Sequence, residues 1–141
     1  MSYEYSEKLK AMKAAEETIG KLRMELGFVR GKTDCWSLVC EYDLLLRAGV
    51  SRLKELNLQY NSEKEFLYSL RKRGFKSFQS LMDYSYYDEV QKQDLGDVGV
   101  LITPLGLRTF SFWKDNKWVT GSDDKKDRTM KLALIARPRR N

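Results

Sequence analysis

The hydrophobic pattern of the chain changes its period once, near Gly96, and this change limits the folds that the sequence can adopt. Before Gly96, apolar residues recur every three or four positions, which is the spacing of amphipathic helices. After it, Val98, Val100 and Ile102 stand at alternate positions, as they do in a strand with one buried face. Helices followed by strands that short turns can join predict an α+β fold, with N-terminal helices and a small antiparallel sheet.

The first part of the chain predicts a long helix and a buried one. Residues 3–26 form an amphipathic segment, and Gly27 ends it because glycine readily adopts the left-handed conformation that follows a helix. The next helix spans 34–48, with Thr33 or Asp34 as the N-cap whose side-chain oxygen accepts a free backbone N–H. Because its face is apolar along most of its length, we expect this helix to lie in the core. The apolar stripe of the first helix comprises Leu9, Met12, Ile19, Leu22 and Leu26.

Shorter elements follow along the rest of the chain. Ser62 and Glu65 match a capping box ahead of another helix, and a further short helix is predicted near 75–82. Asp115-Asn116 predicts a tight turn between neighbouring strands. The predicted strands cover 98–102, 109–113, 117–120 and 130–136, with a polar loop at 121–128.

Length and composition fit a single domain over residues 1–141. Hydrophobic residues make up 42% and charged residues 33% of the chain. A packed core is therefore feasible without a disulfide or a structural metal. We divide this domain into an N-terminal helix at 1–26, a helical part at 27–95, an antiparallel sheet at 96–137 and a basic tail at 138–141.

The net charge of +6 gives little support to a nucleic-acid partner. Lysine and arginine are mixed with 20 acidic residues, and only Arg137 to Arg140 form a short basic cluster. A small basic nucleic-acid-binding protein is one interpretation, which a steep salt dependence of duplex binding would support. No run approaches the ~18 apolar residues of a membrane span. Because residues 1–10 lack the apolar core of a secretory signal, we expect synthesis in the cytoplasm and retention there, unless the protein leaves inside an assembly.

The chain has two cysteines, Cys35 and Cys40, and no histidine. Helical positions five apart point in different directions, so we do not expect a disulfide between them, and free thiols suit a reducing compartment. Neither cysteine has the partners of a zinc site. The acidic loop with Asp123, Asp124 and Asp127 lacks the ordered ligand set of a calcium-binding hand. The sequence therefore predicts neither a metal nor a cofactor.

Cys35 stands at the predicted start of the buried helix. A helix N-terminus carries partial positive charge and free N–H groups, which lower a thiol pKa and can stabilise an oxyanion. The alternative is a small buried apolar side chain, which is the commoner fate of a free cysteine. Cys35 is thus a candidate nucleophile, and a packing role stays open.

The residues around Cys35 resemble a known family. The motif consists of Gly31, Asp34-Cys35 and Trp36-Ser37-Leu38-Val39, followed by Tyr42. It is similar to the motif that opens the catalytic helix of NlpC-type, papain-like cell-wall peptidases in their phage-tail variety. Leu95–Val100 is similar to the Gly-Asp-apolar strand of that family, and Leu107–Val119 resembles its next hairpin. The resemblance covers about residues 27–120. It implies a papain-like sheet packed on a helix that begins with the nucleophile, Cys35.

The chain departs from that family at the general base. The family has a histidine at the start of the second strand, and counting back from Asp115-Asn116 places this position near Arg108. A guanidinium stays protonated near neutral pH, so it cannot accept the thiol proton or protonate a leaving group. Thr120 stands near the position of the family's orienting residue. We therefore interpret Cys35 as a nucleophile-equivalent, inactive position, with Arg108 at the histidine-equivalent position.

Two hypotheses about function stand beside nucleic-acid binding. The resemblance implies a non-catalytic structural protein of a bacteriophage virion, in the tail or at its junction, with other virion or tail subunits as partners and a possible contact with peptidoglycan. The alternative is a cysteine peptidase or amidase acting on peptidoglycan, with Cys35 as nucleophile. Its base would come from another chain or from Glu89, Asp94 or Asp97.

Overall fold

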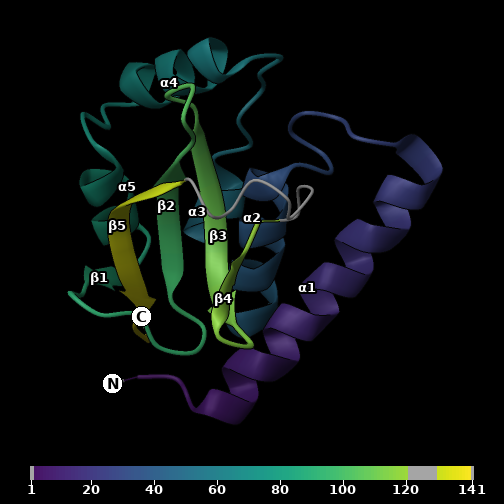
Figure 1. Cartoon of the computed structure of the whole chain (residues 1–141), viewed down its shortest axis with the longest axis vertical. Coiled ribbons are helices and arrows are strands. Elements are labelled where there is room, and N and C mark those ends of the chain that lie inside the picture. The colour runs from purple at the N-terminus through teal and green to yellow at the C-terminus, as the bar shows by residue number, and fades with distance from the viewer. Residues whose placement is uncertain (1, 121–129, 141) are drawn as a thin grey trace.

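The computed structural model describes residues 2–120 and 130–140. Within them the chain is an α+β structure, so the fold class predicted from the change of period is confirmed (Figure 1). The helices are α1 (Tyr5–Leu26), α2 (Cys35–Leu46), α3 (Arg52–Glu55), α4 (Glu63–Lys72) and α5 (Phe78–Tyr84). The strands are β1 (Tyr87–Glu89), β2 (Val98–Ile102), β3 (Arg108–Lys114), β4 (Lys117–Val119) and β5 (Lys131–Pro138).

The five strands form one antiparallel sheet in the order β1-β5-β2-β3-β4 (Figure 1). The last strand of the sequence, β5, lies inside the sheet between β1 and β2. In the β2–β3 pair, Val98 stands opposite Phe112. Asp115 and Asn116 both have positive φ, which is typical of the tight turn of a two-residue hairpin. The turn predicted at these residues is therefore confirmed.

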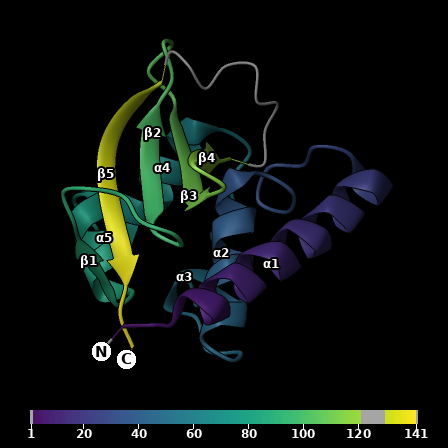
Figure 2. The ribbon, with the colours of Figure 1, turned by 60° about the horizontal axis from the view of Figure 1, so that its bottom comes forward.

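Helix α2 lies between α1 and the sheet and packs along β3 (Figure 2). Leu38, Val39 and Tyr42 are almost completely buried, which confirms the expected core position of this helix. The Tyr42 ring packs on Phe112 with 5.2 Å between centroids, and its hydroxyl donates to the Gly96 carbonyl oxygen at 2.7 Å. The contact ties the end of the loop before β2 to the middle of the core.

Helix α1 follows its predicted apolar stripe over only part of its length. Met12 and Ile19 are buried, as expected, and Leu9 is partly buried. The prediction is wrong at Leu22 and Leu26, which are 36% and 51% exposed. The reason is geometric, since α1 crosses α2 at an angle and its C-terminal end extends away from the sheet (Figures 1 and 2).

Two short elements, α3 and β1, have no counterpart in the sequence-based prediction. β1 has three residues, too few for an alternating pattern to show. It forms because Tyr87 is buried and pairs with Pro138, so β5 runs past the predicted end of that strand at residue 136. The loop predicted at 121–128, with Asp123, Asp124 and Asp127, lies outside the described residues.

Candidate functional site

Cys35 is the first residue of α2, and its sulfur faces β3. The Asp34 carboxylate caps the helix by accepting a hydrogen bond from the Ser37 backbone N–H at 3.0 Å. The backbone N–H of Phe110 in β3 donates to Cys35 Sγ at 3.3 Å. These two residues stand 75 positions apart in the sequence. The fold therefore brings the motif cysteine to the first half of the β3–β4 hairpin, as the sequence-based hypothesis requires.

A pocket of about 160 Å³ adjoins Cys35. Several of its buried lining residues are aromatic: Trp36 lies with its ring centroid 5.1 Å from that of Phe66 and 4.9 Å from that of Phe110, both in edge-on contacts. Arg108, at the start of β3, lines the same pocket. The structure thus brings the two candidate site residues of the sequence together in one cavity.

The Cys35 thiol is not prepared for nucleophilic attack at neutral pH. Burial raises its pKa to about 11; the Phe110 N–H acts in the opposite direction without outweighing burial, and the negative charge of Asp34 adds to the rise. The backbone N–H groups of Cys35 and Trp36 at the helix start do act to lower this pKa, but burial has the larger effect. Loss of hydration of the thiolate outweighs the helix dipole at this position.

Arg108 is held by a carboxylate that sequence reasoning did not single out. Its backbone N–H donates to Glu63 Oε1 at 2.6 Å, and its Nη1 lies 3.8 Å from the same oxygen. Glu63 is the first residue of α4, directly after the cap Ser62. The capping signal at Ser62 places this helix start, but only the tertiary fold shows that it meets β3.

The Asp34 carboxylate has a structural role. Its carboxylate accepts from the Gly31 N–H at 3.0 Å, from the Ser37 hydroxyl at 2.7 Å and from the Tyr60 hydroxyl. Burial and this bond to Asp34 raise the pKa of Tyr60, which also lines the pocket. Asp34 therefore fixes the loop and the start of α2, and Tyr60 is a further pocket residue that the sequence did not reveal.

The three carboxylates considered as substitute bases are absent from the lining of the Cys35 pocket. Asp97 is completely buried and pairs with Arg137 through two hydrogen bonds of 2.9 Å. Asp94 accepts from the Tyr5 hydroxyl at 2.5 Å, and this bond lowers its pKa. Both are committed to contacts around the loop before β2, and Glu89 belongs to a different pocket.

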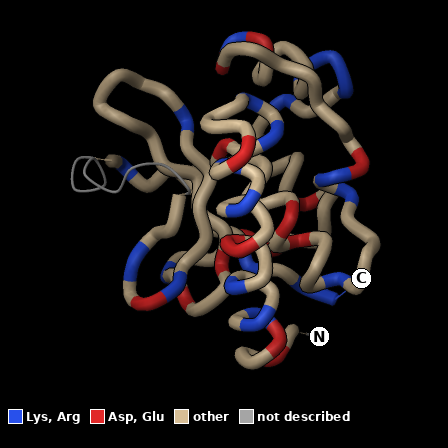
Figure 3. Tube along the Cα trace, turned by 90° about the vertical axis from the view of Figure 1, so that its right-hand side faces the viewer, with Lys and Arg blue, Asp and Glu red and all other residues tan. Residues whose placement is uncertain are grey.

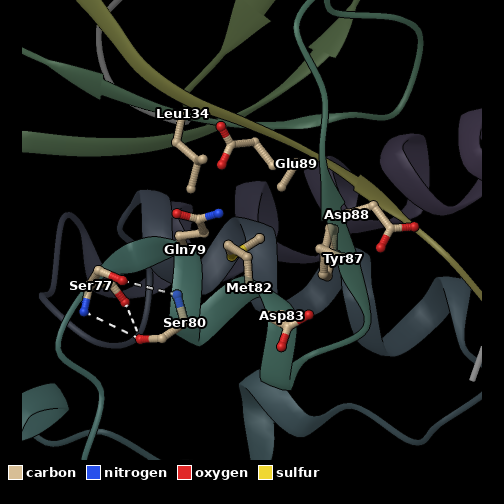
Figure 4. Close-up of a pocket in the computed structure, with 10 residues that line it drawn as sticks. Ser77, Gln79, Ser80, Met82, Asp83, Tyr87, Asp88, Glu89 and Leu134 are labelled. Atoms are coloured by element: carbon tan, nitrogen blue, oxygen red, sulfur yellow. Dashed lines mark hydrogen bonds between the residues drawn. The ribbon is translucent and has the colours of Figure 1, made fainter.

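That second pocket, of about 360 Å³, lies between α5 and the strands β1 and β5 (Figure 4). Glu89, Gln79 and Leu134 point toward one another across its mouth (Figure 4). Ser77 and Ser80 lie at its rim, where they exchange the hydrogen bonds of a capping box. It is larger than the Cys35 pocket, but it contains neither candidate site residue.

Three further features bear on the site. Thr120, at the position of the orienting residue, is buried beyond β4 and does not line the Cys35 pocket. Cys35 and Cys40 are both free thiols, as expected. In the view of Figure 3, basic and acidic residues are mixed along the described part of the trace, which shows no continuous basic face for nucleic acid on this side.

Within residues 2–120 and 130–140, no group of three or more metal-binding side chains is close enough to hold an ion. None of the described helices is both long and apolar enough to cross a membrane. Comparison with known protein families, with curated proteins and with solved structures gives no match for this chain. The features that bear on function are therefore the chemistry of the Cys35 pocket and the motif around it.

Proposed function

We propose that this chain is a non-catalytic, NlpC-like structural protein of a bacteriophage virion, in the tail or at the tail junction. It would be made in the host cytoplasm and act through contacts with other virion subunits. The support is the motif from Gly31 to Val39 combined with a fold in which Cys35 meets the start of β3. The virion location, and a possible contact with peptidoglycan, follow from the family resemblance.

The observation that carries the non-catalytic part is the chemistry around Cys35. A cysteine hydrolase needs a group that takes the thiol proton and later protonates the leaving group. The chain has no histidine, and Arg108, which lies beside Glu63, is an arginine and so is not a general base. Because burial raises the pKa of Cys35 to about 11, this thiol is mostly protonated at pH 7. In this proposal Cys35 lines a pocket but is not a working nucleophile.

Hydrolysis is the direct test. We expect the wild-type chain, Cys35→Ala and buffer to release equal amounts of soluble fragments from purified peptidoglycan. Because the enzyme alternative has one observation in its favour, the presence of the Glu63 carboxylate in the pocket, Glu63→Gln belongs in the same assay. Release by the wild type that both substitutions abolish would establish a peptidase or amidase and overturn the proposal.

The virion location needs a separate experiment. We expect the chain in purified phage particles, with its density in a reconstruction lying among tail or junction subunits. Particles that contain every other structural protein but lack this chain would contradict the location. They would leave the non-catalytic assignment of Cys35 to the hydrolysis assay.

A further inference from the structure

The Cys35 pocket combines a buried aromatic floor with an exposed apolar rim. Trp36 and Phe110 in the floor are 6% and 2% exposed, whereas Phe28 and Leu107, which line the same pocket, are 59% and 43% exposed. Large apolar side chains left in water beside a preformed cavity are typical of binding surfaces. The rim therefore offers apolar area that a ligand can cover.

The charged side chains that line this pocket differ in how many hydrogen-bond partners they have. The Asp34 carboxylate is saturated by donors from the loop, from Ser37 and from Tyr60, and Glu63 accepts from Arg108. Arg30 also lines the pocket, and no described residue forms an ion pair or hydrogen bond with its exposed guanidinium.

Arg108 is only loosely paired through its side chain. Its Nη1 lies 3.8 Å from the Glu63 carboxylate and 3.4 Å from the Gly106 carbonyl oxygen, and the side chain is 39% exposed. A guanidinium carries five N–H donors, so most of those on Arg108 remain open. Free N–H donors of two arginines, Arg30 and Arg108, thus line the pocket.

These features indicate which chemical groups a ligand of the pocket should carry. An apolar floor favours a large apolar side chain, and two guanidinium groups favour a carboxylate, which arginine binds in a bidentate manner. The whole chain carries a net charge of +6, so an acidic partner is attracted and a second copy is repelled. An acidic partner therefore fits the pocket better than self-association does.

From this juxtaposition of an aromatic floor with the arginines at positions 30 and 108, we propose that the Cys35 pocket docks a peptide segment of a partner protein. In that segment a large apolar side chain stands beside a carboxylate. This inference rests on the proposed function, because it specifies the chemistry of one subunit contact. It requires no bond to form or break at Cys35.

The probe is a short Gly/Ser peptide with a central Phe-Glu pair, added to the full ¹⁵N-labelled chain at low salt. We expect the indole N–H signal of Trp36 to shift saturably. Trp113 and Trp118, which contact each other with 5.1 Å between centroids and do not line the pocket, serve as internal references. A probe with Gln in place of Glu should bind about fivefold more weakly, since it loses the charge-assisted hydrogen bonds.

Matched variants test the arginines. Arg30→Gln should weaken the Phe-Glu probe about fivefold, whereas Lys13→Gln, an exposed lysine on α1, should leave its affinity unchanged. Equal binding of the Glu and Gln probes, equal effects of the two variants, a Trp36 signal that never moves, or dimerisation through this face would each overturn the inference. Because hydrolysis is measured separately, a pocket that binds the probe and also cleaves peptidoglycan would sink only the proposed function.

Discussion

The surroundings of the two ends of helix α2 differ in how fully their arginines, Arg47 and Arg30, are bonded. At the C-terminal end, Asp43 is completely buried and accepts from Arg47 Nε at 2.8 Å, from the Ser51 hydroxyl at 2.6 Å and from the Tyr87 hydroxyl at 2.6 Å. At the N-terminal end, a protonated thiol adjoins an open pocket where Arg30 has no described partner. One end is saturated and closed, and the other keeps free donors at its surface.

The C-terminal end of α2 therefore stabilises the fold, whereas the N-terminal end offers groups that can bind a partner. Arg47 also donates to the carbonyl oxygens of Tyr86 and Arg139, so the Asp43 cluster ties α2 to the turn before β1 and to the C-terminal residues. Breaking a buried, fully bonded cluster leaves a charge without a partner, which is costly. Removing an exposed arginine changes little except what the surface can bind. We therefore expect stability effects to fall steeply from the Asp43 end to the Arg30 end.

The largest effect should come from Asp43→Ala. It removes the carboxylate that neutralises the Arg47 guanidinium, which is 2% exposed, and the acceptor of Ser51 and Tyr87, so we expect a loss of about 3–5 kcal/mol in the free energy of unfolding. Urea denaturation followed by circular dichroism measures it. The matched control is Asp88→Ala, whose pair with Arg139 is at the surface and should cost no more than about 1 kcal/mol. Equal losses for the two variants would remove the distinction between the ends.

Gly96→Ala should follow, because Gly96 sits against α2 with φ +82°. An added Cβ would lie 2.8 Å from the Tyr42 hydroxyl oxygen and would collide with the Lys8 side chain. We expect a loss of about 2–4 kcal/mol from overpacking and backbone strain. Gly20→Ala, in α1 with nothing within 4 Å of the added Cβ, should instead stabilise the chain by up to about 1 kcal/mol. A neutral Gly96→Ala would mean that the loop before β2 is not held by α2.

Asp34→Ala should have an intermediate effect on stability and a distinct effect on Cys35. Loss of the helix cap and of the Tyr60 hydrogen bond should cost about 2 kcal/mol. The Asp34 charge raises the pKa of Cys35, so the variant should also ionise this thiol at lower pH. Ser62→Ala, which removes only the cap of α4, should cost about 1 kcal/mol and leave the Cys35 titration unchanged. An unchanged titration in Asp34→Ala would show that burial alone sets this pKa.

The smallest effect is expected for Arg30→Gln. The side chain is exposed and has no described partner, so its free energy of unfolding should stay within about 0.5 kcal/mol of the wild type. The same denaturation measurement applies. A loss of more than about 1 kcal/mol would show that Arg30 stabilises the fold and that the pocket rim is not free for a ligand.

The sequence predicted the central elements of the fold better than the peripheral ones. The core position of α2, the Asp34 cap and the turn at Asp115-Asn116 depend on local periodicity and turn chemistry, which the sequence displays directly. β1 and the exposure of Leu22 depend on what lies across the fold, so local patterns could not reveal them.

The candidate site divides in the same way. The spacing of the motifs was enough to predict that Cys35 lies near the start of β3. The contact of Glu63 with Arg108 and the raised pKa of the thiol arise from tertiary burial, which no spacing encodes. Sequence reasoning therefore found the position of the site and its missing base, but not the tertiary contacts that set the pKa of its thiol.

The pH dependence of Cys35 alkylation tests the central claim most directly. In a Cys40→Ala background, Cys35 is the only thiol, and its rate with iodoacetamide should rise about tenfold per pH unit above neutrality because only the thiolate reacts. The rate should reach half its maximum near pH 11, as the pKa of about 11 requires, provided that the chain is still folded there by circular dichroism. A midpoint below about 8.5, the ordinary thiol value, would show an activated nucleophile and contradict the account.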